Sequence, residues 1–337
     1  MRAMVVGTGF GQSHIEWLKE LDVTIDVLAF CKNKSRAMEC ACRYGIPAIT
    51  DNPVGAIRGG NIDLLIVVSP PFVHHVPLIA GLEQGMIVVS DKPLADSCRT
   101  SLVLTELAKK LKARAFVTFQ WRSHSALRRL RKIISDDALG RIIGLDIEFH
   151  HDFLAGPSSQ WEWRHQVTQA GAGALGDLGI HMLDLIAYLF PAKWRVTHAR
   201  LSKAWFERTV EAGSVLCNTD DVAEVLLTDY ASGADARVVV SRATVGLRLM
   251  RVVSRGTNGT AIISIDPTDG SGSTEVLFSN PADRHRQSLR PENMNPYLYL
   301  MQFLKVPGSA PPAELATFEQ GHLAQLLMED ALCFSRN

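Results

Sequence analysis

Three titratable residues recur at helical spacing in a glycine-rich stretch near the middle of the chain. Residues 171–184 contain Asp177, His181 and Asp184. Residues three or four apart share one face of a helix. A histidine titrates near neutral pH and can move a proton, and a carboxylate one turn away can orient it. A helix-stabilising Asp–His pair has the same spacing, whereas a metal site would need further His or Cys ligands.

A lysine follows the apolar run Ile87–Ser90, within the sequence Asp91-Lys92-Pro93. The Lys92–Pro93 bond is a candidate cis peptide, which would fix the direction of the lysine. An ammonium at such a strand end can donate a hydrogen bond to a substrate oxygen and stabilise negative charge there. Partial burial would lower its pKa towards a range useful for proton transfer. A surface lysine at a strand end is the alternative, and these residues alone leave both open.

Glycines at the start of the chain predict where a dinucleotide binds. An apolar run feeds Gly7-x-Gly9-Phe10-Gly11, and apolar residues then recur at helical spacing. Glycines permit a tight turn and let backbone N–H groups approach a pyrophosphate at a helix N-terminus. Gln12 stands where the third glycine of the usual pattern would be. We interpret this strand, turn and helix as a dinucleotide site.

The first 120 residues alternate strand and helix patterns, which predicts a doubly wound parallel sheet covered on both faces. Ligands bind at the carboxyl ends of the strands in such sheets. The predicted strands are Ala3–Val6, Thr24–Phe30, Ile62–Val68, Ile87–Ser90 and Ala115–Phe119.

The segments after the second and third predicted strands indicate the cofactor type and its surroundings. An NAD site usually has an acidic residue after the second strand, but this chain has Lys32, Asn33, Lys34 and Arg36 there. Such a cluster would attract a 2′-phosphate, so we expect NADP(H) in preference to NAD(H), although a solvated helix entry would look the same. The third strand is followed by Ser69-Pro70 and then by His74, which we interpret as scaffolding on the cofactor side.

The second half of the chain predicts an α+β domain with a large, open, mainly antiparallel sheet, because strands follow one another without helices. Residues 283–296 are polar and bounded by prolines, so we expect a mobile loop there. We expect a first domain of residues 1–120 and a second domain of residues 121–337. A final helix near 316–334 could pack back on the first domain. The predicted strands are Ile142–His150, Val196–Leu201, Val222–Tyr230, Ala236–Ser241, Leu247–Val253, Thr260–Ile265 and Glu275–Phe278.

Composition excludes several classes of protein. The 337 residues have a formal net charge of zero and no long basic stretch, which argues against nucleic acid as a main partner. The apolar content of 47% is ordinary for a globular protein. The apolar runs are too short to span a membrane, and no signal peptide opens the sequence, so we expect a cytoplasmic protein. The six cysteines show no metal-ligand pattern and are interpreted as reduced thiols.

The glycine turn, Ser69-Pro70-Pro71 with His74, and Asp91-Lys92-Pro93 together resemble the glucose–fructose oxidoreductase / inositol dehydrogenase / MocA (Gfo/Idh/MocA) family. That family carries Glu-Lys-Pro after the fourth strand, with the lysine in its active site; here Asp91 replaces the glutamate. The residues that we expect to contact the cofactor are Gly7, Gly9, Phe10, Gly11, Lys32, Asn33, Lys34, Arg36, Ser69, Pro70, His74, Asp91, Lys92 and Gln120.

The resemblance also assigns roles in the second half. Family members carry an aspartate and a histidine in the glycine-rich segment at the substrate pocket, which makes Asp177 and His181 the pair and leaves Asp184 structural. Lys92 and His181 would be catalytic with Asp177. The implied substrate contacts are Arg122, Trp163, Arg164, Asp177 and His181.

The implied activity is hydride transfer between a nicotinamide and a carbonyl or secondary alcohol of a small molecule: a sugar, sugar nucleotide or cyclitol. Reduction is favoured if NADPH is the cofactor. The same family includes imine and tetrapyrrole reductases and non-catalytic regulators, and these remain alternatives. The open sheet implies a homodimer or homotetramer.

Overall fold

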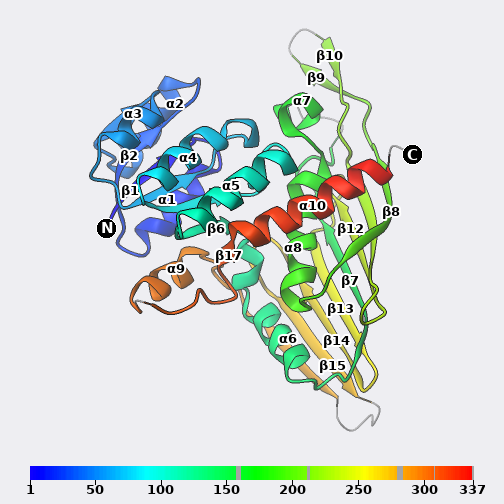
Figure 1. Ribbon diagram of the computed structural model, residues 1–337. Helices are drawn as coiled ribbons and strands as arrows, with labels where there is room; N and C mark the ends of the chain where they lie inside the picture. The colour runs from blue at the N-terminus through cyan, green and yellow to red at the C-terminus, as the bar shows by residue number, and fades with distance from the viewer. Residues whose placement is uncertain (157–160, 211–212, 279–283, 307, 336–337) are drawn as a thin grey trace. The chain divides into compact units, whose positions relative to one another are not determined.

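The computed structural model describes residues 1–156, 161–210, 213–278, 284–306 and 308–335 (Figure 1). The chain forms two compact units, one of Met1–Phe119 with Asn295–Gln325 and one of Gln120–Met294 with Leu326–Asn337. The change of unit after Phe119 lies close to the boundary expected from the sequence. Residues 295–325 are grouped with the first unit, because they pair with and pack against its sheet.

The first unit is built on a sheet with strand order β17-β6-β5-β4-β1-β2-β3. All neighbours pair in parallel except β17, which runs antiparallel to β6. This is the doubly wound order of dinucleotide-binding domains and confirms the predicted fold class. The strands are β1 (Arg2–Val6), β2 (Thr24–Ala29), β3 (Ala48–Thr50), β4 (Leu64–Val67), β5 (Ile87–Asp91), β6 (Ala115–Thr118) and β17 (Ala316–Thr317).

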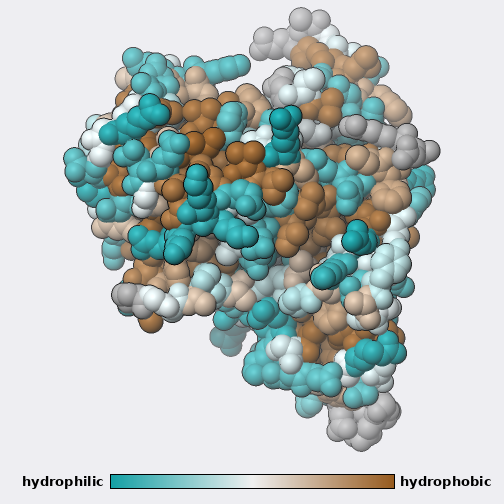
Figure 2. All heavy atoms as spheres, viewed as in Figure 1, coloured by the Kyte–Doolittle hydropathy of each residue, from teal (hydrophilic) through white to brown (hydrophobic). Residues whose placement is uncertain are grey.

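Helices connect these strands, and each helix packs on the sheet through one apolar stripe. Asn33 begins the second of them by accepting a hydrogen bond from the Arg36 backbone N–H, and Gly45 ends it with a φ of 65°. The helices of this unit are α1 (Gly11–Lys19), α2 (Lys34–Tyr44), α3 (Pro53–Arg58), the 3₁₀ turn η1 (Pro71–Val73), α4 (His75–Glu83), α5 (Cys98–Lys110) and α9 (Tyr297–Leu304). Figure 2 shows apolar groups gathered over α4 and α5, where Val76, Leu102 and Val103 are exposed.

The second unit is built on an eight-stranded sheet of order β16-β15-β14-β13-β7-β12-β11-β8. Only β7 and β12 pair in parallel, so the sheet is mainly antiparallel, as predicted. β9 and β10 form a separate antiparallel pair. The strands are β7 (Ile142–His150), β8 (Arg195–Ser202), β9 (Glu207–Val210), β10 (Gly213–Leu216), β11 (Val222–Asp229), β12 (Ala234–Ser241), β13 (Leu249–Gly256), β14 (Gly259–Ile265), β15 (Gly272–Phe278) and β16 (His285–Leu289).

Helices cover one face of this sheet, and alternate strand residues such as Ala223, Val225 and Leu227 are buried beneath them (Figure 1). The opposite face carries half-buried and exposed side chains. The helices are η2 (Gln120–Ser123), α6 (Ser125–Ser135), η3 (Trp163–His165), α7 (Val167–Ala170), the π-helical turn η4 (Leu175–Gly179), α8 (Ile180–Leu189) and α10 (Phe318–Phe334), which begins in the first unit.

One sequence expectation is wrong within the described residues. The stretch 283–296 was expected to be a loop, but residues 285–289 form β16, which pairs antiparallel with β15 at the sheet edge. Residue 283 lies outside the described residues. The described helices include none that combines the length and the apolar character needed to cross a bilayer.

Candidate functional site

The glycine turn after β1 has the geometry of a nucleotide cradle. Gly7 has a φ of +124°, and a Cβ atom there would lie 2.5 Å from the backbone oxygen of Val68, so only glycine fits. A Cβ on Gly9 would meet no atom within 4 Å, which leaves the outer side of the turn open. Gly11 begins α1, whose first backbone N–H groups have no helical partners. This open turn at a helix N-terminus suits a pyrophosphate.

The segment after β2 presents cations and no carboxylate. The side chains of Cys31 to Arg36 are exposed. Asn33 caps the N-terminus of α2, and Lys34 is the first residue of that helix. The side chains of Lys32, Lys34 and Arg36 can therefore reach a phosphate from a helix N-terminus without competing with an acidic neighbour in this segment.

Lys92 lies directly after β5 and is half-buried, and its bond to Pro93 is cis, as predicted. The preceding carboxylate is fixed by β6, since the Thr118 hydroxyl donates a 2.7 Å hydrogen bond to Asp91 Oδ1. The first unit thus anchors the residue that takes the place of the family glutamate.

Sequence reasoning missed two buried residues next to this anchor. His14 on α1 and Tyr297 on α9 are both fully buried, and His14 Nδ1 lies 2.5 Å from the Tyr297 hydroxyl. The other ring nitrogen, Nε2, lies 3.8 Å from Asp91 Oδ1. Burial lowers the pKa of His14 from 6.5 to about 4, despite the opposing effect of Asp91. A histidine beside Ile15 on the apolar face of α1 was the available signal.

His74 joins two turns of the first unit. Its ring nitrogens contact the backbone oxygens of Ser69 and Leu94, and the side chain is 1% exposed. Burial lowers the pKa of His74, so the ring is neutral at physiological pH. The geometry agrees with scaffolding: His74 ties the Ser69-Pro70 turn to the segment that follows Lys92.

In the second unit, the predicted helical face is not one continuous α-helix. Asp177 lies in the π-helical turn η4, whereas His181 and Asp184 lie in α8. Such π turns within helices often mark functional sites. His181 is 4% exposed.

A neighbouring aspartate requires a glycine at position 173, just before this turn. A Cβ on Gly173 would lie 1.8 Å from the Asp220 backbone oxygen. The carboxylate of Asp220 accepts hydrogen bonds from the backbone N–H groups of Gly173 and Leu175, at 2.7 and 2.8 Å. Burial raises the pKa of Asp220, and these two donors oppose that shift. Asp220 therefore caps the start of the helix that carries Asp177 and His181.

Asp177 is held by two arginines. Its Oδ1 lies 3.5 Å from Arg164 Nε, and its Oδ2 lies 3.4 Å from Arg242 Nη1. Arg242 is fully buried and also donates to Asp221 Oδ1 at 3.1 Å and to the Thr219 hydroxyl at 2.9 Å. Sequence reasoning missed Arg242, although a charged residue directly after the apolar strand β12 was a signal.

Asp184 and Arg122 form a buried bidentate ion pair. Arg122 Nε and Nη2 donate to the two carboxylate oxygens at 2.8 and 2.6 Å, and both side chains are 2% exposed. The Arg122 guanidinium also lies over the Tyr188 ring, 5.2 Å from its centre. Asp184 agrees with its structural interpretation. The substrate role of Arg122 stays a sequence prediction, and since its guanidinium is enclosed we do not carry it into the proposed site.

The 3₁₀ turn η3 positions Trp163 and Arg164. The Arg164 guanidinium lies over the Trp163 ring, 4.6 Å from its centre, and Nη1 donates a 3.0 Å hydrogen bond to Glu162. Glu162 in turn donates its backbone N–H to the buried ring of His165. Gln120 begins η2 and is half-buried.

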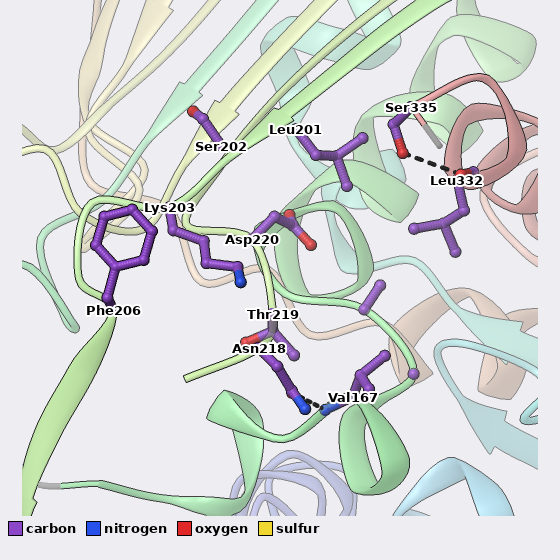
Figure 3. Close-up of a pocket in the computed structure, with 12 residues that line it drawn as sticks. Val167, Leu201, Ser202, Lys203, Phe206, Asn218, Thr219, Asp220, Leu332 and Ser335 are labelled. Carbon is purple, nitrogen blue, oxygen red and sulfur yellow. Dashed lines mark hydrogen bonds between the residues drawn. The ribbon is translucent and has the colours of Figure 1, made fainter. Parts of the chain in front are cut away.

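A cavity of about 360 Å³ opens elsewhere in the second unit (Figure 3). None of the predicted catalytic residues lines it. Its polar lining includes Lys203, Asn218, Asp220 and Ser335, with apolar walls from Leu332 and other side chains. The Asn218 side chain is already used, since it accepts a hydrogen bond from the Val167 backbone. Among the described residues, no group of three or more His, Cys, Asp or Glu side chains could hold a metal ion.

Curated proteins with similar sequences include dehydrogenases of sugars. The chain is 28% identical to a levoglucosan dehydrogenase of Pseudarthrobacter phenanthrenivorans over 75% of this chain and 67% of that protein. It is 31% identical to a Bacillus subtilis glucose-6-phosphate 3-dehydrogenase over 48% of this chain, and 27% identical to an Escherichia coli D-glucoside 3-dehydrogenase over 50%. The chain spans less than half the length of these last two relatives.

Solved structures show the same fold. A levoglucosan dehydrogenase in complex with NADH and L-sorbose has a TM-score of 0.88 at 23% identity, covering 100% of this chain and 96% of that one.

Family models match both parts of the chain. Residues 1–119 match the oxidoreductase family with an NAD-binding Rossmann fold, and residues 127–262 match the GFO/IDH/MocA C-terminal domain. A glycine cradle after β1, a lysine after β5 and an aspartate and histidine around a π turn thus occur in a chain that belongs to the Gfo/Idh/MocA family of oxidoreductases.

Proposed function

We propose that this protein is an NADP(H)-dependent oxidoreductase that interconverts a secondary alcohol and a carbonyl of a sugar or a related cyclic polyol. The observation that supports this most directly is the position of Lys92, after β5, beside the anchored Asp91. The relatives named above are dehydrogenases of sugars, which supports the substrate class. The preference for NADPH favours reduction as the physiological direction.

Each catalytic residue has a defined part in this proposal. The nicotinamide, when bound, supplies or accepts the hydride. The Lys92 ammonium donates a hydrogen bond to the reacting substrate oxygen and stabilises the negative charge that develops there. His181 exchanges the proton with that oxygen, and Asp177, one helical turn before it, orients the ring. The ion pairs with Arg164 and Arg242 hold the Asp177 carboxylate in position.

The cofactor preference rests on the exposed cations after β2. Lys32, Lys34 and Arg36 follow β2, where an NAD-specific site has a carboxylate, and the segment Cys31–Arg36 has none. A solved levoglucosan dehydrogenase contains NADH, so the relatives do not supply the preference for NADP(H). We assign that preference to this chain from its own cations. Fluorescence titration with NADPH and NADH measures it directly. We expect NADPH to bind at least tenfold more tightly, and Lys34→Ala/Arg36→Ala to remove that difference; tighter binding of NADH contradicts the assignment.

A Lys92→Met variant tests the enzymatic role. We expect kcat to fall by at least about a hundredfold, as when one electrostatic donor to a developing oxyanion is lost, with cofactor affinity almost unchanged. Lys132→Met is the matched control, because Lys132 forms an exposed ion pair with Asp136 and should leave turnover unchanged. Turnover preserved in Lys92→Met would contradict the proposed role of the lysine.

A further inference from the structure

The arginine that we expect at the substrate site has no edge available for an anion. A guanidinium binds a phosphate or carboxylate most strongly through two parallel N–H groups on one edge. The Nε of Arg164 faces Asp177 at 3.5 Å, and its Nη1 donates to Glu162 at 3.0 Å. The Trp163 ring covers one face of the guanidinium. Each of its two N–H edges therefore has one nitrogen facing a carboxylate.

The second arginine of this cluster has all three guanidinium nitrogens engaged. Arg242 uses Nε for Asp221, Nη2 for Thr219, and Nη1 for Asp177 and the Arg164 backbone oxygen. Its side chain is fully buried, so a substrate cannot reach it without breaking these bonds. The other charged groups of the cluster, in contrast, reach solvent: the side chains of Glu162, Arg164 and Asp177 are 34%, 30% and 19% exposed.

The solvent-facing part of this cluster carries more negative than positive charge. Glu162 and Asp177 bring two negative charges and Arg164 one positive charge, whereas Asp221 and Arg242 are buried and paired with each other. A phosphate or carboxylate brought to these residues would be repelled by the exposed acids, whereas sugar hydroxyls can donate hydrogen bonds to them. The Trp163 ring offers an apolar face of the kind that packs on a sugar ring.

We infer that this protein acts on an uncharged, hydroxyl-rich sugar and discriminates against sugar phosphates and sugar acids, and that Glu162 sets this discrimination by occupying Arg164. The inference rests on the proposed function, since it concerns the substrate of the same site. Curated relatives include dehydrogenases of both neutral and phosphorylated sugars, so the family alone does not fix this choice.

Steady-state kinetics with matched sugars test the inference. The probes are methyl glucopyranoside, glucose 6-phosphate and glucuronate, each assayed by nicotinamide absorbance with NADP⁺ and NAD⁺. We expect kcat/KM for the neutral sugar to exceed that of both anionic sugars by at least tenfold. Glu162→Gln keeps the size and the acceptor oxygen but removes the charge, so it should raise kcat/KM for the anionic sugars relative to the neutral one by about tenfold, the size of one charge-assisted hydrogen bond.

Glu224→Gln is the matched control, because Glu224 pairs with Arg237 on an exposed part of the large sheet. It should leave the ratio unchanged. The inference is overturned if the wild type prefers an anionic sugar, or if Glu162→Gln has the same ratio of kcat/KM for anionic and neutral sugars as the wild type. In either case the turnover of a sugar still supports the proposed function. Equal binding of NADPH by the wild type and Lys92→Met shows that the cofactor site is intact. If no sugar is then turned over with either cofactor, the proposed function is wrong and the inference is wrong with it.

Discussion

The buried pair of Arg122 and Asp184 allows a quantitative prediction. Asp184→Ala removes a carboxylate that accepts two hydrogen bonds, at 2.6 and 2.8 Å, from a guanidinium that is 2% exposed. The guanidinium then remains buried without its counter-charge. Removing one partner of a buried ion pair costs about 3–5 kcal/mol. We expect a loss at the upper end of this range, because the pair is bidentate and well enclosed.

The double variant Arg122→Met/Asp184→Leu should be far more stable than Asp184→Ala. Apolar side chains of similar volume avoid the cost of burying two charges, so such replacements are often neutral or stabilising. A double-mutant cycle isolates the coupling between the two side chains. A large coupling energy with near-normal stability of the double variant would identify the pair as structural.

Urea unfolding followed by tryptophan fluorescence measures both variants. Five of the six tryptophans belong to the second unit, so the signal reports mainly on the unit that contains the pair. With a slope of about 2–3 kcal/mol/M, Asp184→Ala should lower the midpoint by about 1–2 M. A shift below about 0.3 M would refute the reasoning. So would a double variant that is stable but binds substrate poorly, since that result would return Arg122 to the substrate site.

Three further predictions follow from single positions. Gly173→Ala should destabilise the second unit by about 3 kcal/mol, because its Cβ would meet the Asp220 backbone oxygen at 1.8 Å, whereas Gly59→Ala, with its nearest contact at 3.4 Å, should be nearly neutral in urea unfolding. Burial lowers the pKa of His14 to about 4, so between pH 4 and 6.5 the unfolded chain binds more protons than the folded chain. The free energy of unfolding should therefore fall as the pH falls through this window. In His14→Gln, unfolding measured across this pH range should show about 3 kcal/mol less of that decrease. We propose that two copies associate through the open face of the large sheet, so Val253→Glu should lower the mass measured by light scattering, and a monomeric wild type would contradict this.

The parallel sheet of the first unit could be predicted because its strands are buried on both faces. Buried parallel strands are continuous apolar runs, and Leu64–Val67 is fully buried along its length. In contrast, β16 is an edge strand with the sequence His-Arg-Gln-Ser-Leu, and its side chains are largely exposed. It pairs through its backbone with β15, so no hydrophobic pattern announces it.

The partners of the site residues could not be predicted because they come from distant parts of the chain. His14 and Tyr297 are 283 positions apart, and Arg122 and Asp184 are 62 apart. Spacing on a helix suggests only local partners, and the family resemblance selected Asp177 and His181 from among them. The structure gives Asp177 two arginines from other elements, and local spacing carries no information about them.

The register of the large sheet explains why one of those arginines is available. In the antiparallel pair of β11 and β12, Val222 lies opposite Ser241, so the residues just outside the ladder, Asp221 and Arg242, face each other. Arg242 donates its backbone N–H to Asp221 at 3.0 Å and its Nε to the same residue's carboxylate. A slip of one residue would move Arg242 to the other face. Strand register therefore places the arginine that holds Asp177. Asp221→Asn should weaken the hold of residue 221 on Arg242, shift Asp177 and so change the KM for substrate, although residue 221 does not contact the substrate.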